Sequence, residues 1–147
     1  MKNILLPLDF SEAAPQILAK AQSMAQSLDA KLWLLHVAAP NPAFVGYEAG
    51  PQTVRDQRAE TLKNEHKQLQ DWASETSASG IESEALLVQG ETGATIIEEA
   101  KKLEAEMIII GSHGHGALYN MLVGSTCQTV LKASEIPVLV VPIRSAV

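Results

Sequence analysis

A glycine-rich segment with two histidines contains the residue types best suited to bind a charged ligand. Glycine permits positive φ and lets backbone N–H groups approach a ligand closely, so such a segment can form an anion-binding nest. A helix that begins at the end of the segment would add its own N–H groups and two hydroxyls. The segment therefore predicts a phosphate site. Its candidate residues are Gly111, His113, Gly114, His115, Gly116, Gly124, Ser125 and Thr126.

The spacing of these residues excludes two common phosphate motifs. Ala117 and Leu118 stand where a Walker A loop requires Lys and Ser or Thr. The dinucleotide fingerprint would place its glycines after the first strand. His113 and His115 could donate to phosphate oxygens, or they could be exposed loop residues without a role. The position of His113 between two glycines favours a role for that residue.

A second candidate segment, Pro7-Leu8-Asp9, follows the first apolar run. Asp9 could accept a hydrogen bond from an adenine amino group or a ribose hydroxyl, or help to hold Mg²⁺. A turn residue that helps to begin the next helix is the alternative. We interpret His36 and His66 as packing residues, and Cys127 as a buried structural thiol.

The elements that would position these segments alternate between apolar runs and helical stretches. The expected strands are residues 3–8, 31–37, 84–88, 106–110 and 136–143. Helical periodicity marks residues 14–28, 59–72, 92–103 and 126–134. Thr92 is the expected cap of the third helix, and residues 38–51 are expected to form a loop. This alternation predicts a three-layer α/β/α fold with a five-stranded parallel sheet, in one domain covering residues 1–147.

A strand order of 3-2-1-4-5 would bring the two candidate segments together. In that order the direction of winding reverses between the first and fourth strands, and ligands bind beyond the carboxyl ends of strands at such a point. The Asp9 segment follows the first strand, and the glycine-rich segment follows the fourth. A single crevice between these strands is therefore the expected site.

Composition excludes several other classes of protein. The 147 residues carry a formal charge of −6 without a Lys/Arg run, which argues against a nucleic-acid partner. A single cysteine cannot form an intrachain disulfide or a cysteine-based zinc site. The apolar runs fall far short of the roughly 20 residues that span a bilayer, so we expect a cytoplasmic protein. No nucleophile–base pair or carboxylate cluster is evident, so we predict no catalytic residues and no protein metal site.

The sequence resembles the universal stress protein family along its full length. The segments ILLPLDFSE, LLHV, IIIGSHG and IPVLVV are similar to that family's segments and occur in the same order. Gly111-x2-Gly114-x9-Gly124-Ser125 is similar to the G-2x-G-9x-G-(S/T) pattern of the ATP-binding branch. The resemblance implies the 3-2-1-4-5 fold, which is like that of the adenine nucleotide alpha-hydrolases. It also implies ATP, with Mg²⁺, as the ligand.

Carried over by position, the resemblance also implies roles for single residues. Asp9 would lie at the adenine–ribose end of the nucleotide, with Pro7 and Leu8 beside it. Val37 would meet the adenine through its backbone. The glycines and histidines after the fourth strand would line the phosphates, and residues 124–126 would close the site. Members usually pair through the fifth strand, which implies a homodimer through residues 136–143 and leaves a tetramer open.

The leading functional hypothesis is a nucleotide-binding regulatory protein of the stress response. The sequence is also similar to a family member linked to an ectoine transporter, which implies a membrane transporter as a partner. The alternative is a nucleotide-transfer or slowly ATP-hydrolysing enzyme, with Phe44 and Tyr47 in a substrate pocket wall. A phospho-acceptor receiver is disfavoured because Gln89 stands where its aspartate is required, and a flavin protein would purify yellow.

Overall fold

The computed structural model describes residues 1–39, 52–113 and 123–143, with the side chains of residues 52–55 left out of the description. Strands and helices alternate along the chain. The strands are β1 (Asn3–Pro7), β2 (Lys31–Ala38), β3 (Ser83–Gln89), β4 (Met107–Gly111) and β5 (Val138–Val141). The helices are α1 (Ala14–Leu28), α2 (Gln52–Ala78), α3 (Thr92–Lys102) and α4 (Ser125–Ala133).

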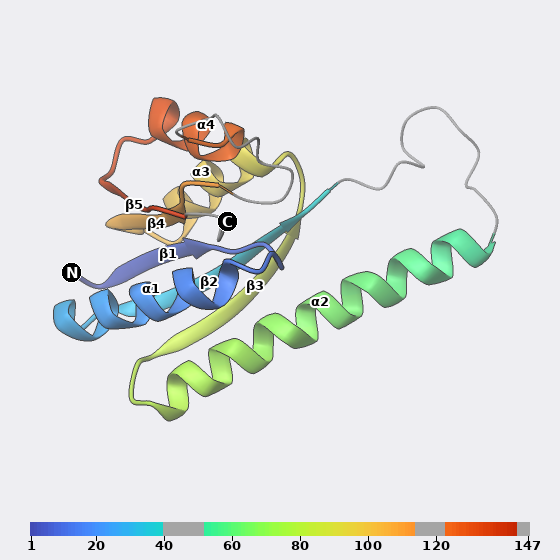
Figure 1. The fold of residues 1–147 in the computed structure, drawn as a ribbon, viewed down its shortest axis with the longest axis horizontal. Coiled ribbons are helices and arrows are strands. Elements are labelled where there is room, and N and C mark those ends of the chain that lie inside the picture. Colours follow the sequence, from blue (N-terminus) through green and yellow to red (C-terminus); the bar gives the residue numbers. More distant parts are fainter. Residues whose placement is uncertain (40–51, 114–122, 144–147) are drawn as a thin grey trace.

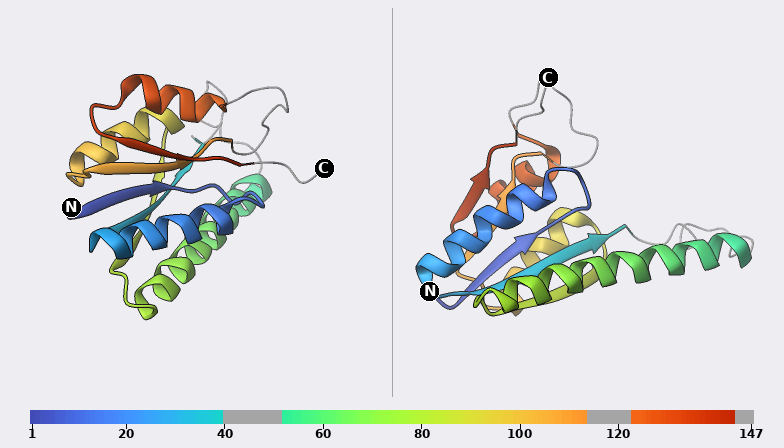
Figure 2. Two further views of the ribbon diagram at one scale, coloured as in Figure 1. Left: turned by 60° about the vertical axis from the view of Figure 1, so that its left-hand side comes forward. Right: turned by 60° about the horizontal axis from the view of Figure 1, so that its bottom comes forward.

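The strands form one parallel sheet in the order β3-β2-β1-β4-β5, which confirms the predicted fold class and strand order (Figure 1). Helices α1 and α2 cover one face of the sheet, and α3 and α4 cover the other (Figure 2). Because both faces are covered, the central strands can be apolar at every position. That is why β1 and β4 have uninterrupted apolar sequences.

Alternate residues of the strands supply two separate cores. Ile4 and Leu6 of β1 pack in the core beneath α1 and α2, together with Leu69 of α2. Leu5 packs on the opposite face, where Ile96 of α3 is also fully buried. Side chains of consecutive strand residues point to opposite faces, so one strand serves both layers. These cores fix the strands whose ends carry the site.

Helix α2 is longer than the apolar stripe over residues 59–72 predicts. It runs from Gln52 to Ala78, and its N-terminal part extends beyond the sheet (Figure 1). The part of a helix that does not pack on a sheet needs no apolar stripe. The hydrophobic periodicity of the sequence therefore does not reveal that part. The helix ends before Gly80, whose φ of +95° allows the sharp turn into β3.

The predicted cap of α3 is wrong by one residue. Glu91 is the N-cap, and Thr92 is the first residue of the helix. The Glu91 carboxylate accepts hydrogen bonds from Gly93 N at 3.2 Å and Ala94 N at 2.8 Å. Glutamate is not among the usual capping residues, so its sequence position did not suggest this role.

None of the helices in the described ranges combines the length and the apolar content that crossing a membrane requires.

Candidate functional site

The candidate site lies where β1 and β4 stop pairing before their carboxyl ends, and the gap between the two strand ends is called the crevice. The two strands are in register at only two pairs, Ile4 with Met107 and Leu5 with Ile108. Both strands continue past this point, β1 to Pro7 and β4 to Gly111. The order of the sheet reverses between them, which is where an open parallel sheet binds its ligands. The structure thus places Asp9 and Gly111, which follow or end these strands, at one edge of the sheet.

The backbone of Val37 faces this crevice from β2. Leu35 O accepts from Leu8 N at 2.8 Å, on the β1 side of β2, whereas Ala38 O accepts from Gly90 N at 3.0 Å, on the β3 side. Neighbouring residues of a parallel strand bond to opposite sides, so the Val37 main chain shares the side of Leu35. β1 ends at Pro7, the register partner of Leu35, so among the described strands none lies beside Val37 there. A planar ring that carries hydrogen-bonding groups on its edge could therefore bond to the main chain of Val37.

The loop after β1 is held by its own backbone and side chains. Leu8 is buried, and the Asp9 carboxylate accepts from Ser11 N at 3.0 Å. This contact matches the alternative interpretation of Asp9 as a turn residue before α1. A carboxylate can accept more than one hydrogen bond, so the turn role does not exclude a ligand role.

Gly111 is required for packing rather than for a positive φ. It is the last residue of β4, and its φ does not lie in the left-handed region. A Cβ at this position would lie 2.5 Å from Ile17 Cδ1 of α1. The freedom to adopt a positive φ, which the sequence suggested for this glycine, is therefore not used at Gly111. Its main chain still faces the β1 side, because Ile108 N and Ser112 N both bond toward β5.

Ser112 organises the segment after β4, although the sequence analysis did not single it out. Its N donates to Val141 O at 2.9 Å, and its carbonyl accepts from Gly124 N at 2.6 Å. Its Oγ accepts from Ile143 N at 2.8 Å and lies 2.9 Å from His113 Nδ1. Ser112 is buried, so these bonds fix the start of α4 relative to the end of β4.

The contact with Ser112 also orients His113. The hydroxyl can give its hydrogen to His113 Nδ1, and the ring then keeps Nε2–H as a donor. A donor at this place could bind a phosphate oxygen. The other predicted residues of the segment, Gly114, His115 and Gly116, lie outside the described residues.

Helix α4 begins at a glycine N-cap, which has no side chain to bond to the first backbone N–H groups. Gly124 is the N-cap, in an extended conformation with φ −71° and ψ 165°, and Ser125 and Thr126 form the first turn. Among the described residues no side chain caps this helix. The amides and the positive end of the helix dipole attract anions. The structure thus confirms that residues 124–126 begin a helix at the edge of the crevice.

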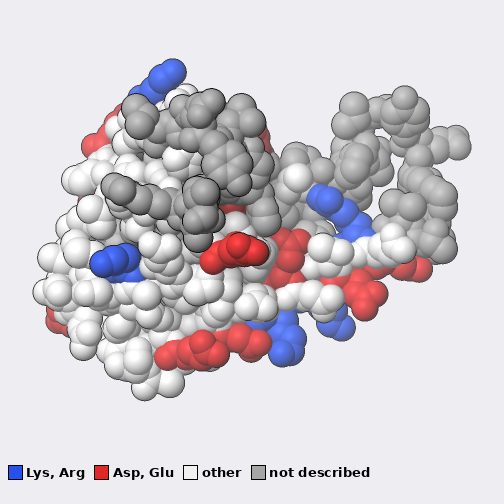
Figure 3. All heavy atoms as spheres, in the orientation of Figure 1, with Lys and Arg blue, Asp and Glu red and all other residues white. Residues whose placement is uncertain are grey.

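Within the glycine-rich segment and the first turn of α4, the groups that can bind an anion are backbone amides, hydroxyls and histidines rather than Lys or Arg side chains. Residues 111–126 contain no Lys or Arg. Figure 3 shows acidic and basic side chains mixed along α2. Cys127, in the first turn of α4, is buried, and this burial raises the pKa of its thiol. It therefore stays a neutral thiol, as predicted for a structural cysteine.

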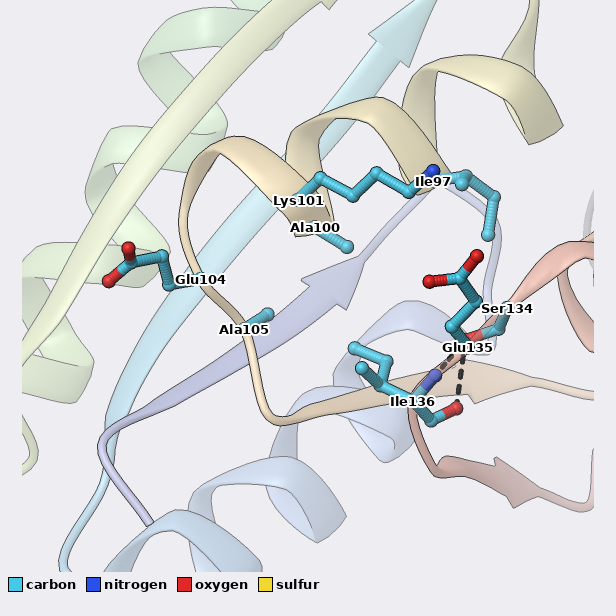
Figure 4. Close-up of a pocket in the computed structure, with 8 residues that line it drawn as sticks. All are labelled: Ile97, Ala100, Lys101, Glu104, Ala105, Ser134, Glu135 and Ile136. Atoms are coloured by element: carbon cyan, nitrogen blue, oxygen red, sulfur yellow. Dashed lines mark hydrogen bonds between the residues drawn. The ribbon is translucent and has the colours of Figure 1, made fainter.

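A hollow lies at the opposite end of the sheet, before β4 and β5 (Figure 4). Ile97 and Ala100 of α3 line it together with Ile136. The Ser134 hydroxyl there donates to Ile136 O and accepts from Ile136 N, so it is satisfied within the chain. This hollow is separate from the crevice and brings no predicted site residue together.

These features define a doubly wound parallel α/β domain with an open helix N-terminus beside the reversal of strand order. Residues 1–142 match the Universal stress protein family, and the chain belongs to that family. A universal stress protein of Thermus aquaticus is 32% identical over 143 residues, which are 95% of this chain and 98% of that protein. Universal stress protein YxiE of Bacillus subtilis is 28% identical over 144 residues, covering 95% of this chain and 97% of the relative.

Solved structures agree with this assignment. The structure of the Methanocaldococcus jannaschii protein MJ0577 matches with a TM-score of 0.81 at 28% identity, over 99% of this chain and 98% of that one. A universal stress protein in complex with cAMP matches over 96% of both chains, with a TM-score of 0.67 at 20% identity. One from Archaeoglobus fulgidus in complex with dAMP covers 95% of this chain and 97% of its own, with a TM-score of 0.63 at 20% identity. At 20% identity the last two show the shared fold.

Proposed function

We propose that this protein binds ATP in the crevice between β1 and β4 and acts as a nucleotide-dependent regulator in the stress response. The adenine would meet the Val37 backbone, and the ribose would lie near Asp9. The phosphates would lie against the β4–α4 segment and the N-terminus of α4. The observation that carries the proposal is the uncapped N-terminus of α4 at the edge of the crevice.

The described residues fit the two ends of a nucleotide. The separation of β1 and β4 leaves the main chain of Val37 and of Gly111 facing the same gap. Helix N-termini bind phosphate groups through their N–H donors and dipole. Two family structures, one with cAMP and one with dAMP, support an adenine nucleotide as the ligand class.

Mg²⁺ would enter this site with the ATP. The ion keeps much of its water shell and is commonly bound through substrate phosphates with one or two protein carboxylates. Asp9, on the loop after β1, would supply such a carboxylate. We infer that Mg²⁺ neutralises part of the phosphate charge, since residues 111–126 supply no Lys or Arg.

The proposal is tested by releasing any nucleotide that co-purifies. The full-length protein is denatured, and the released compound is identified by chromatography; we expect ATP. Protein freed of nucleotide should then rebind Mg·ATP in calorimetry, and adenosine should bind more weakly because it lacks phosphates. Purified protein that carries no nucleotide and binds none would contradict the proposal.

Regulation through self-association is part of the same proposal. β5 is an edge strand with apolar residues, and an unpaired edge favours addition of a second chain. We propose a homodimer through residues 136–143, and a Leu139→Lys variant should lower the mass seen in analytical ultracentrifugation. An unchanged mass would contradict pairing through β5. A tetramer, a cytoplasmic location and an osmolyte transporter as partner stay predictions of the sequence.

Hydrolysis of ATP, if it occurs, should be slow. The nucleotide-transfer alternative needs an acceptor pocket, whose predicted wall, Phe44 and Tyr47, lies outside the described residues. Turnover of ATP in the presence of an added acceptor would favour that alternative over a regulatory function.

A further inference from the structure

A histidine of β2 joins three elements on the nucleoside side of the crevice. His36 Nδ1 lies 2.8 Å from the carbonyl oxygen of Leu8, on the loop between β1 and α1. Its Nε2 lies 2.6 Å from Glu65 Oε2, on α2. The Phe10 ring lies against the His36 ring, with 4.6 Å between the centroids. The imidazole therefore connects the loop that carries Asp9 to helix α2.

The two hydrogen-bond partners of His36 determine which protonation state of its ring makes both contacts. A carbonyl oxygen and a carboxylate are both acceptors. A neutral imidazole has one N–H and can satisfy one of them, whereas an imidazolium donates to both. The side chains of His36 and Glu65 are 12% and 25% exposed, so water only partly screens their contact. A charge-assisted bond is strengthened by that shielding.

The surroundings of the ring are also suited to a positive charge. Phe10 lies between His36 and Trp72, on which it stacks at 5.6 Å between centroids, and an aromatic neighbour attracts a cation. Glu65 on α2 contacts the ring directly, and Asp9 on the loop and Arg58 on α2 are among the other charged residues of the elements that the ring joins. Asp9 accepts from Ser11 N, and Arg58 donates to the carbonyl of Ala39 beyond β2.

We propose that protonated His36, held by Glu65, is a positioning residue for the nucleoside half of the ATP site. This inference rests on the proposed function. The ring fixes the Leu8 carbonyl and, through it, the loop that places Asp9. When the ring loses a proton, one of its two nitrogens turns a lone pair toward an acceptor, so the bond to the Leu8 carbonyl or the bond to Glu65 is lost and the loop loosens. ATP affinity then depends on the proton that this ring carries.

The test compares ATP affinity of wild-type protein and Glu65→Gln at two pH values by calorimetry. At about pH 6 the neutral amide is a weaker acceptor for the imidazolium, so affinity should fall about five- to tenfold. At about pH 8.5 the amide N–H can donate to the neutral ring, which the carboxylate cannot do. The variant should then bind ATP as well as the wild type or better.

A purely structural role for Glu65 would change affinity by the same factor at both pH values, and that result would overturn the proposal. The matched control is Glu75→Gln, an exposed carboxylate on the same helix, which should change affinity at neither pH. An effect of the control equal to that of Glu65→Gln would also overturn it.

Nitrogen NMR of the His36 ring in nucleotide-free protein separates this proposal from the proposed function. We expect both ring nitrogens to carry hydrogen at about pH 6 in the wild type. A neutral ring at that pH would overturn the positioning role even if ATP binds. A doubly protonated ring in a protein that binds no ATP would overturn the proposed function and leave the contact between the three elements standing.

Discussion

The N-termini of α3 and α4 lie on the same face of the sheet, yet they present their backbone N–H groups differently. At α3, the Glu91 carboxylate accepts from two amides of the first turn. At α4, Gly124 has no side chain to do this. α3 follows β3, at the edge of the sheet, whereas α4 follows β4, beside the reversal of strand order. The helix beside the crevice is thus the one whose amides are left for a ligand.

The largest expected effect comes from giving α4 the kind of cap that α3 has. Gly124 has an extended conformation that any residue can adopt, so Gly124→Asp can place a carboxylate on the first-turn amides. ATP affinity should fall about 30-fold or more, because the new charge occupies the amides and repels phosphate. Stability should rise by about 0.5–1 kcal/mol. Calorimetry and urea denaturation measure the two effects.

Gly124→Asn is the matched control for that variant. Its side chain has the same shape and can cap the helix, but it carries no charge. We expect a smaller loss of affinity than with aspartate. Equal losses would show that occupation or bulk, not charge, excludes the phosphate.

The second-largest expected effect is a loss of stability when the contact between α3 and α4 is crowded. A Cβ on Gly93 of α3 would lie 2.4 Å from Thr129 Cγ2 of α4. Gly93→Ala should therefore lower the free energy of unfolding by about 1–3 kcal/mol, as overpacking does. Thr129→Ser removes the offending methyl and keeps the hydroxyl that donates to Ser125 O. The double variant should recover most of the loss in urea denaturation; independent, additive losses would refute the close approach.

A third, smaller effect comes from opening the α3 N-terminus. Glu91→Ala removes the carboxylate that caps the helix and should cost about 1 kcal/mol of stability. ATP affinity should not change, since α3 lies away from the crevice. A loss of affinity comparable with that of Gly124→Asp would contradict the distinction between the two helix ends.

The smallest expected effect concerns Cys127, in the first turn of α4. A helix N-terminus normally favours a thiolate, but burial raises the pKa of this thiol above its ordinary value. Above about pH 9 the unfolded chain releases this proton and the folded chain keeps it, so stability should fall as pH rises. Cys127→Ala should flatten that decline between about pH 8 and 10 in urea denaturation. An equal slope in both proteins would count against a raised pKa.

The sequence predicted the fold because the fold follows from local patterns. Apolar runs mark strands that are buried on both faces, and alternation with helices orients them in parallel. The contacts that shape the site depend on residues far apart in the sequence. Ser112 bonds to Gly124, Val141 and Ile143, and no local pattern indicates these partners.

His36 illustrates the same limit. Its place in an apolar strand suggested packing, but the ring reaches a carbonyl of one loop and a carboxylate of α2. Gly111 shows the reverse case, because its residue type was noticed for backbone freedom while the structure explains it by the contact with Ile17. The residue types of His36 and Gly111 drew attention to these positions. The physical reason for each residue became clear only from the residues that it contacts in the fold.

The most direct test of the central claim is backbone amide NMR during titration with Mg·ATP and, separately, with adenosine. Mg·ATP should shift the amide signals of Ser125 and Thr126 strongly, together with those of Leu8, Asp9 and Val37. Adenosine should shift only the signals of Leu8, Asp9 and Val37. The amide signals of Gly93 and Ala94 in α3 should stay unchanged with both ligands. Signals of Ser125 and Thr126 that do not respond to saturating Mg·ATP would contradict phosphate binding at the N-terminus of α4.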